Sequence, residues 1–75
     1  MADTAQQDRI MVQVNGEAWP VAAGCSIAAM LEEIGIDPRK VAVEQNREVV
    51  PRSTLGDVQV RDGDSFEIVH FVGGG

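Results

Sequence analysis

Three consecutive glycines, Gly73, Gly74 and Gly75, end the chain directly after the apolar residues Phe71 and Val72. Because glycine loses more conformational entropy on ordering than any other residue, these three cannot add to the stability of a fold. They form a thin segment without side chains, which can enter a channel too narrow for any Cβ. Glycine at these terminal positions therefore indicates the Gly75 carboxylate as the group that reacts.

A carboxylate is a poor electrophile until one of its oxygens becomes a leaving group, as happens in an acyl-adenylate formed with ATP. At Gly75 the missing side chain also leaves the carbonyl carbon open to attack. This pattern indicates a protein whose own C-terminus is the substrate of a partner enzyme. Composition alone leaves a second interpretation open, in which the glycines are only a frayed end.

Other residues with reactive side chains are sparse. Cys25 precedes a predicted helix, where a thiol gains acidity, but no second cysteine can resolve it, so we expect a small buried residue. His70 lies in an apolar run, and we expect an ordinary strand position for it and no acid–base catalysis. Asp62 and Asp64 lack the further ligands of a calcium loop, so we expect a turn there and no metal site.

Length and composition exclude several function classes. A chain of 75 residues builds one small core, which counts against an enzyme with a deep pocket of its own. A single cysteine favours a reducing compartment, and no apolar stretch approaches the roughly 18 residues that cross a bilayer. The net charge of −6 and the scattered basic residues disfavour nucleic acid. We expect a cytoplasmic protein that binds neither nucleic acid nor membrane.

The first secondary structure predicted is a β-hairpin. Apolar and polar residues alternate from Ile10 to Asn15, which is the pattern of a half-buried strand. Asn15-Gly16 is a strong signal for a type I′ turn, and residues 17–22 form the returning strand. Pro20 lacks an N–H donor, so this second strand belongs at a sheet edge or has Pro20 at a non-bonded position.

One helix follows the hairpin. Ser26 is a suitable N-cap, and Gly35 can end the helix in the left-handed conformation with Ile36 in the accompanying contact. Between them a single apolar stripe consists of Ile27, Met30, Leu31 and Ile34. This stripe predicts a helix that packs one side against a sheet.

Further strands are predicted at residues 41–45 and 48–50, and an irregular segment with a helical turn near Leu55 follows them. After a tight turn, residues 65–72 form the most apolar strand, which we expect at the centre of the sheet. The order is ββαββ, an α+β ubiquitin-like β-grasp with a mixed four- to five-stranded sheet and one main helix. The predicted division is a disordered leader at residues 1–9, the β-grasp domain at 10–72 and a flexible glycine tail at 73–75.

A sheet covered by one helix leaves its other face free for a partner. Met11, Trp19 and Phe71 are the large apolar residues that can lie on that open face, although each can equally complete the small core. Phe71 and Val72 lead directly into the glycines, so we expect them to join any contact that the tail makes.

Several segments together resemble the ThiS family of thiamin-biosynthesis sulfur carriers. They are "VNGE" in the first hairpin, "VAVEQN", "VVPRS" and "DGDSFEIVHFVGGG", and the resemblance runs from about Ile10 to Gly75. No single segment is decisive, but their combination in this order with a terminal Gly-Gly is specific. The family's terminal glycine falls on Gly75 and its penultimate glycine on Gly74, while Gly73 is one more than the family pattern needs.

The resemblance implies a carrier that is a substrate and not an enzyme. A ThiF-like adenylyltransferase consumes ATP to adenylate Gly75, so no bound cofactor is expected on the carrier itself. A persulfide-bearing sulfur donor then replaces AMP and leaves a thiocarboxylate, and a ThiG-like thiazole synthase takes the sulfur. The predicted site residues are Gly75 as the reacting group, with Gly74, Gly73, Val72 and Phe71 in the tail and partner contact.

Two alternatives stay open at this point. A molybdopterin-type sulfur carrier or a ubiquitin-like protein modifier shares the same fold and the same terminal Gly-Gly chemistry. A β-grasp binding module without any chemistry at its end belongs to another class, and it would keep its function after deletion of Gly75.

Overall fold

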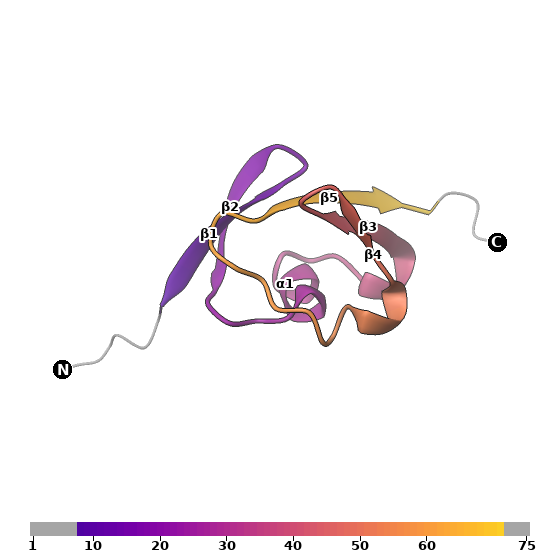
Figure 1. The fold of residues 1–75 in the computed structure, drawn as a ribbon, viewed down its shortest axis with the longest axis horizontal. Coiled ribbons are helices and arrows are strands. Elements are labelled where there is room, and N and C mark those ends of the chain that lie inside the picture. The colour runs from indigo at the N-terminus through magenta and orange to yellow at the C-terminus, as the bar shows by residue number, and fades with distance from the viewer. Residues whose placement is uncertain (1–7, 72–75) are drawn as a thin grey trace.

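The computed structural model describes residues 8–71, which form one five-stranded mixed sheet with a helix across one face (Figure 1). The strand order is β2-β1-β5-β3-β4, in which β5 runs parallel to β1 and the other neighbours are antiparallel. The elements are β1 (Arg9–Val14), β2 (Glu17–Ala22), α1 (Ile27–Glu33), η1 (Pro38–Lys40), β3 (Val41–Gln45), β4 (Glu48–Val50), η2 (Arg52–Thr54) and β5 (Ser65–His70). This is the expected ubiquitin-like β-grasp fold, with the most apolar strand at the centre. The order along the chain is ββαβββ, so the predicted order ββαββ was one strand short: the short strand β4 is a separate strand at the sheet edge.

The predicted leader and tail lie largely outside the described residues: nothing is described for residues 1–7 or 72–75. Strand β1 begins at Arg9, one residue before its expected start, and Arg9 pairs with Ala22 of β2. The Arg9 side chain also forms an ion pair with Glu33 at the end of α1. The first residue of β1 therefore contacts the end of α1 through an ion pair. The alternating pattern that starts at Ile10 did not indicate this contact.

Both hairpin turns require residues with positive φ. Asn15 and Gly16 have φ of 51° and 87° between β1 and β2, and Asn46 and Arg47 have φ of 52° and 74° between β3 and β4. Asparagine and glycine enter this region readily, which explains the first turn. In the second turn Asn46 also enters this region readily, whereas a positive φ is less usual for an arginine. Strand β2 lies at the edge of the sheet, as Pro20 predicted.

Helix α1 has the expected signals at both ends. Ser26 Oγ accepts a hydrogen bond of 3.1 Å from the Ala29 N–H. At the other end Gly35 has φ of 90°, its N–H donates to the Glu32 carbonyl, and the Ile36 N–H donates to the Leu31 carbonyl at 2.8 Å. These two bonds are a Schellman motif, which satisfies the last carbonyls of a helix only seven residues long.

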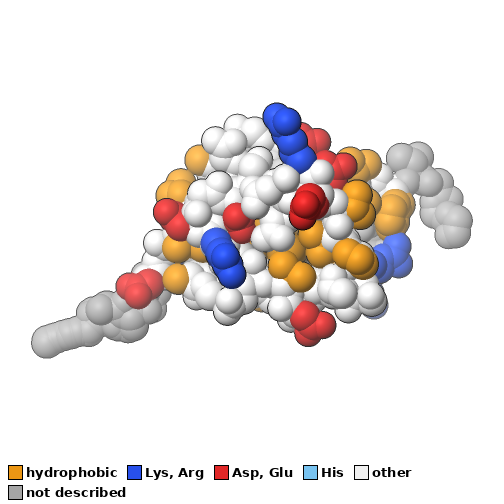
Figure 2. Space-filling model, viewed as in Figure 1, with side chains coloured by type: hydrophobic (Ala, Val, Ile, Leu, Met, Phe, Trp, Pro, Cys, Tyr) orange, Lys and Arg blue, Asp and Glu red, His pale blue; other side chains and the backbone are white. Residues whose placement is uncertain are grey.

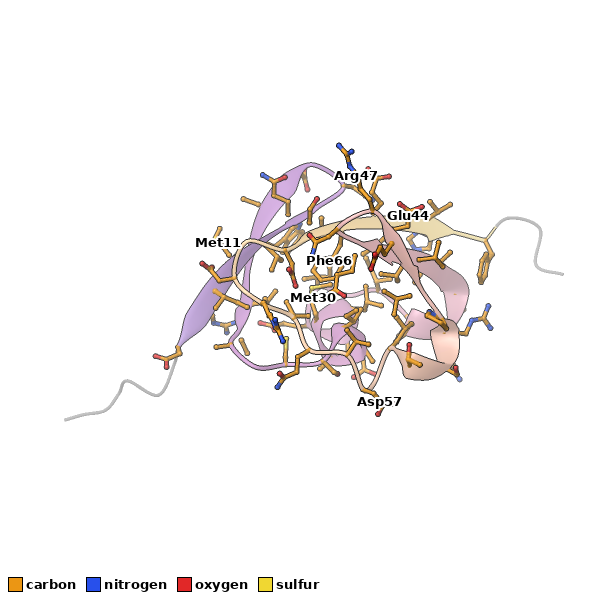
Figure 3. All side chains as sticks on the ribbon, in the orientation of Figure 1. Met11, Met30, Glu44, Arg47, Asp57 and Phe66 are labelled. Carbon is orange, nitrogen blue, oxygen red and sulfur yellow. The ribbon has the colours of Figure 1, made fainter. Side chains whose placement is uncertain are left out.

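The core lies between the sheet and α1. Phe66 from β5 and Met30 from α1 point toward one another across this layer (Figure 3), and both are at most 1% exposed. The remaining buried apolar residues are Val12, Val14, Val21, Ile27, Leu31, Val41, Val43, Leu55, Val60 and Ile68. Trp19 packs against this cluster and so does not belong to the open face. No helix among the described residues is long and apolar enough to cross a membrane.

Candidate functional site

Phe71 is the last described residue, and backbone pairing fixes its position at the end of β5. Its N–H donates a hydrogen bond of 3.0 Å to the Lys40 carbonyl, which extends the β3–β5 pairing one residue past His70. Although β5 is the central strand, it pairs with β1 only at Ser65 and Phe66, so β3 is the strand that holds the chain near Phe71. The predicted site residues Val72, Gly73, Gly74 and Gly75 lie outside the described residues, so of that set only Phe71 can be placed.

An arginine stands over the Phe71 ring. The Arg52 guanidinium carbon is 5.0 Å from the ring centroid, within the range of a cation–π contact. Arg52 begins η2, where its carbonyl accepts a hydrogen bond from Leu55, and Leu55 is 3% exposed and anchored in the core. Lys40, Arg52 and Phe71 are called the tail root below. No local sequence pattern places Arg52 beside Phe71, which lies nineteen positions further along the chain.

The open face of the sheet is apolar near the tail root. Ala42 of β3 lies opposite Val69 of β5, and Val49 of β4 lies on the same face. Val49, Val69 and Phe71 are 73%, 62% and 52% exposed, well above what a core position shows. We call Ala42, Val49, Val69 and Phe71 the open-face patch. Figure 2 shows hydrophobic side chains gathered at this end of the molecule with basic side chains beside them.

Next to the open-face patch, a shallow apolar groove of about 200 Å³ runs along the end of β4. Its lining includes Val49, Val50, Pro51, Leu55 and Phe71, with Arg52 among the lining residues. A second, polar depression is formed near the β3–β4 turn by residues such as Gln45, Asp57 and Arg61. Two tail-root residues, Arg52 and Phe71, line the apolar groove, and none lines the polar depression.

The other reactive side chains do not form a site. Burial raises the pKa of the Cys25 thiol, and the nearby Glu33 carboxylate raises it further, so the thiol is less nucleophilic than an ordinary one. His70 is exposed on β5, opposite Val41 of β3. Among residues 8–71, no three His, Cys, Asp or Glu side chains lie close enough together to hold a metal ion.

Asp64 is a residue whose role the sequence analysis missed, because it read "DGD" only as a turn. Its carboxylate is 9% exposed and accepts hydrogen bonds from Asn46 Nδ2 at 3.0 Å, Gln45 Nε2 at 3.0 Å and the Arg61 N–H at 2.9 Å. Burial opposes ionisation, but these three donors outweigh it, so the pKa of Asp64 lies below its ordinary value. Asp64 joins the start of β5 to the β3–β4 hairpin.

The sequence profile of the ThiS family matches residues 12–75, which includes the terminal glycines. The chain belongs to the ThiS family. It is 37% identical to the sulfur carrier protein ThiS of Bacillus subtilis over 67 residues, covering 87% of this chain and all of that one. The crystal structure of the thiamine biosynthesis protein ThiS from Geobacter metallireducens superposes with a TM-score of 0.74 at 32% identity, covering 88% of this chain and all of that one.

A more similar relative is a longer protein. The thiazole synthase of Paramagnetospirillum magneticum is 52% identical over 62 residues, which are 83% of this chain and 19% of that protein. The chain thus spans about a fifth of the length of this family relative. A segment like this small β-grasp domain therefore occurs within a longer chain that bears the name thiazole synthase.

Proposed function

We propose that this protein is the sulfur carrier of thiamin thiazole biosynthesis and that it carries sulfur as a thiocarboxylate on Gly75. The observation that carries the proposal is the family match that extends through Gly75 together with the fixed departure of the chain at Phe71. Full-length relatives named sulfur carrier protein ThiS in Bacillus subtilis and Thermus thermophilus support it. In this function the chain is a substrate of other enzymes and contributes no catalytic pocket.

The proposed chemistry takes place at the terminal carbonyl. A carboxylate oxygen of Gly75 attacks the α-phosphorus of ATP and releases pyrophosphate, which leaves an acyl-adenylate on a ThiF-like adenylyltransferase. A persulfide sulfur then attacks the carbonyl carbon and releases AMP, which forms an acyl disulfide. A second thiol attacks the donor-side sulfur of this acyl disulfide, which forms a new disulfide between that thiol and the donor cysteine and releases the thiocarboxylate. The absence of a side chain at Gly75 and at Gly74 removes steric hindrance at each of these steps.

Each of these reactions requires the tail to be ordered in a partner. Fixing three glycines costs about 3–6 kcal/mol at roughly 1–2 kcal/mol per residue. Burial of about 200 Å² of apolar surface contributes roughly 5 kcal/mol, which is enough to offset that cost. The open-face patch, which includes the last described residue, offers exposed apolar surface, since Val49, Val69 and Phe71 are all more than half exposed.

A ThiG-like thiazole synthase is the proposed acceptor of the sulfur. The relatives from Paramagnetospirillum magneticum and Magnetococcus marinus support this partner, because a segment 52% or 44% identical to this chain lies within a protein named thiazole synthase. A carrier segment within the same chain as the synthase is consistent with direct contact between the two. The ThiF-like enzyme and the persulfide donor remain part of the proposal.

The intact mass of the protein isolated from cells tests the function directly. We expect a species heavier by the difference between a sulfur and an oxygen atom, and fragmentation should assign that gain to Gly75. Deletion of Gly75 should abolish both the heavier species and thiazole formation. A protein that supports thiazole synthesis equally well after this deletion would falsify the carrier function and favour a binding module.

A further inference from the structure

We propose that Arg52 binds a carboxylate on the protein that activates the tail, so that the partner surface at the tail root is apolar with an acidic side chain beside it. This inference rests on the proposed function, because it concerns how the carrier docks before Gly75 reacts. It begins from the contact of Arg52 with Phe71, 5.0 Å from guanidinium carbon to ring centroid.

The Arg52 side chain is held at its base and turned toward the tail root. Arg52 is the first residue of η2. This short helix is fixed by a hydrogen bond of 2.9 Å from the Thr54 N–H to the Pro51 carbonyl and by the buried Leu55 that follows it. A contact with an aromatic ring uses no hydrogen-bond acceptor, so the guanidinium N–H groups keep their capacity to donate. Arginine presents five such donors in a planar fork that matches the geometry of a carboxylate.

The charge distribution of the chain favours an acidic partner at this end. The whole chain has a net charge of −6, yet the Arg52 guanidinium lies against Phe71 at the tail root. The ion pairs within residues 8–71 are Arg9–Glu33 and Arg39–Asp37, so Arg52 forms no ion pair with a described carboxylate. An acidic protein with an arginine free of intramolecular ion pairs beside its apolar patch approaches a partner in a preferred orientation, with that arginine toward negative charge.

The apolar surroundings make such an ion pair effective once a partner covers them. The groove beside Arg52 is lined by residues such as Val49, Val50 and Leu55. Displacement of water from this groove lowers the local dielectric and strengthens a charge-assisted hydrogen bond. The docking contact would also lie close to the reacting group, because the four residues after Phe71 span at most about 13 to 14 Å.

The test compares two matched variants, Arg52→Gln and Arg61→Gln, which remove the same charge by the same substitution. Arg61 is exposed and lies just before the start of β5, whereas Phe71 follows its end. The full chain is titrated into a ThiF-like adenylyltransferase that accepts the wild-type protein, and pyrophosphate release is measured at low and high ionic strength. We expect Arg52→Gln to raise KM about tenfold or more, the size of a charge-assisted hydrogen bond, with kcat within about twofold.

The salt dependence of KM distinguishes a bound carboxylate from a purely structural role. Wild type and Arg61→Gln should show the same increase of KM with salt, and Arg52→Gln should show a much smaller increase. Arg52→Lys should keep the wild-type salt dependence but recover only part of the affinity that Arg52→Gln loses. Equal KM values for Arg52→Gln and Arg61→Gln would overturn the inference and leave the carrier function standing. So would a loss confined to kcat, which would mean that Arg52 only orients Phe71. If no ThiF-like enzyme adenylates the wild-type chain, the proposed function fails, and this inference fails with it.

Discussion

The side-chain amide of Asn15 forms two hydrogen bonds with the backbone of Ile68, fifty-three residues further along the chain. Its Oδ1 accepts from the Ile68 N–H at 2.8 Å, and its Nδ2 donates to the Ile68 carbonyl at 3.1 Å. Backbone pairing between β1 and β5 covers only Gln13 with Ser65 and Val14 with Phe66. The Asn15 side-chain amide thus takes the place of a backbone partner for Ile68. It extends the contact between the first hairpin and the central strand β5.

Asn15→Gly should destabilise the fold by about 1–3 kcal/mol, because it removes both hydrogen bonds. Glycine accepts the φ of 51° at this position, so the variant adds no backbone strain. Urea denaturation followed by circular dichroism gives the free energy of unfolding. Arg47→Gly is the control, since Arg47 occupies the other hairpin turn at a φ of 74° and is exposed. A loss equal in both variants would mean that turn entropy, and not the Asn15 amide, matters.

Asp64 should make stability depend on pH in the acid range. Its pKa is lower in the folded chain than the unfolded value of about 3.9, so its ionised form stabilises the fold above that pH. This stabilisation should disappear as pH falls through about 4 toward the lower folded pKa, when the carboxylate loses its charge. The free energy of unfolding measured between pH 7 and pH 2.5 would show the decline.

Asp64→Asn should lose about 1–3 kcal/mol at pH 7 and show a flatter decline below pH 5 than wild type. The matched control is Asp57→Asn, which changes an exposed carboxylate on the same side of the β3–β4 turn depression. That control should keep the wild-type pH dependence. Parallel curves for wild type and Asp64→Asn would contradict the role assigned to the three donors around Asp64.

Phe71→Ala should lower kcat/KM for adenylation about tenfold while changing the free energy of unfolding by less than about 0.5 kcal/mol. The reason is that Phe71 is 52% exposed and contributes to a docking contact more than to the core. Phe71→Leu should recover most of the loss. Met11→Ala serves as the control, because Met11 is 48% exposed but lies on β1, away from the tail root. Unchanged adenylation kinetics in Phe71→Ala would end the proposal that the open-face patch docks.

Cys25 should react slowly with alkylating reagents at neutral pH and should be dispensable for sulfur delivery. Burial and the Glu33 carboxylate raise its pKa, so little thiolate is present. Cys25→Ser should deliver sulfur at a rate within about twofold of wild type. The free energy of unfolding of this variant should be lower, because Cys25 packs partly against the core. Loss of delivery in a folded Cys25→Ser protein would point to a sulfur relay through this thiol.

Local sequence signals predicted most of the elements, because each depends on neighbouring residues. The alternation before Asn15, the Ser26 cap and the left-handed Gly35 all appear in the structure as expected. The central place of the last strand followed from its apolar density. The terminal glycines, with the motifs before them, indicated the family that the profile then confirmed.

The tertiary structure alone decided which side chains lie together. Arg52 reaches Phe71, Asn15 reaches Ile68 and Asp64 reaches the β3–β4 turn across 18 to 53 positions in the chain. No periodicity or short motif encodes such contacts, because they depend on the order in which the strands pair. The sequence by itself therefore determined the elements and indicated the family, whereas the packing of the sheet determined the charged and apolar surface around Phe71.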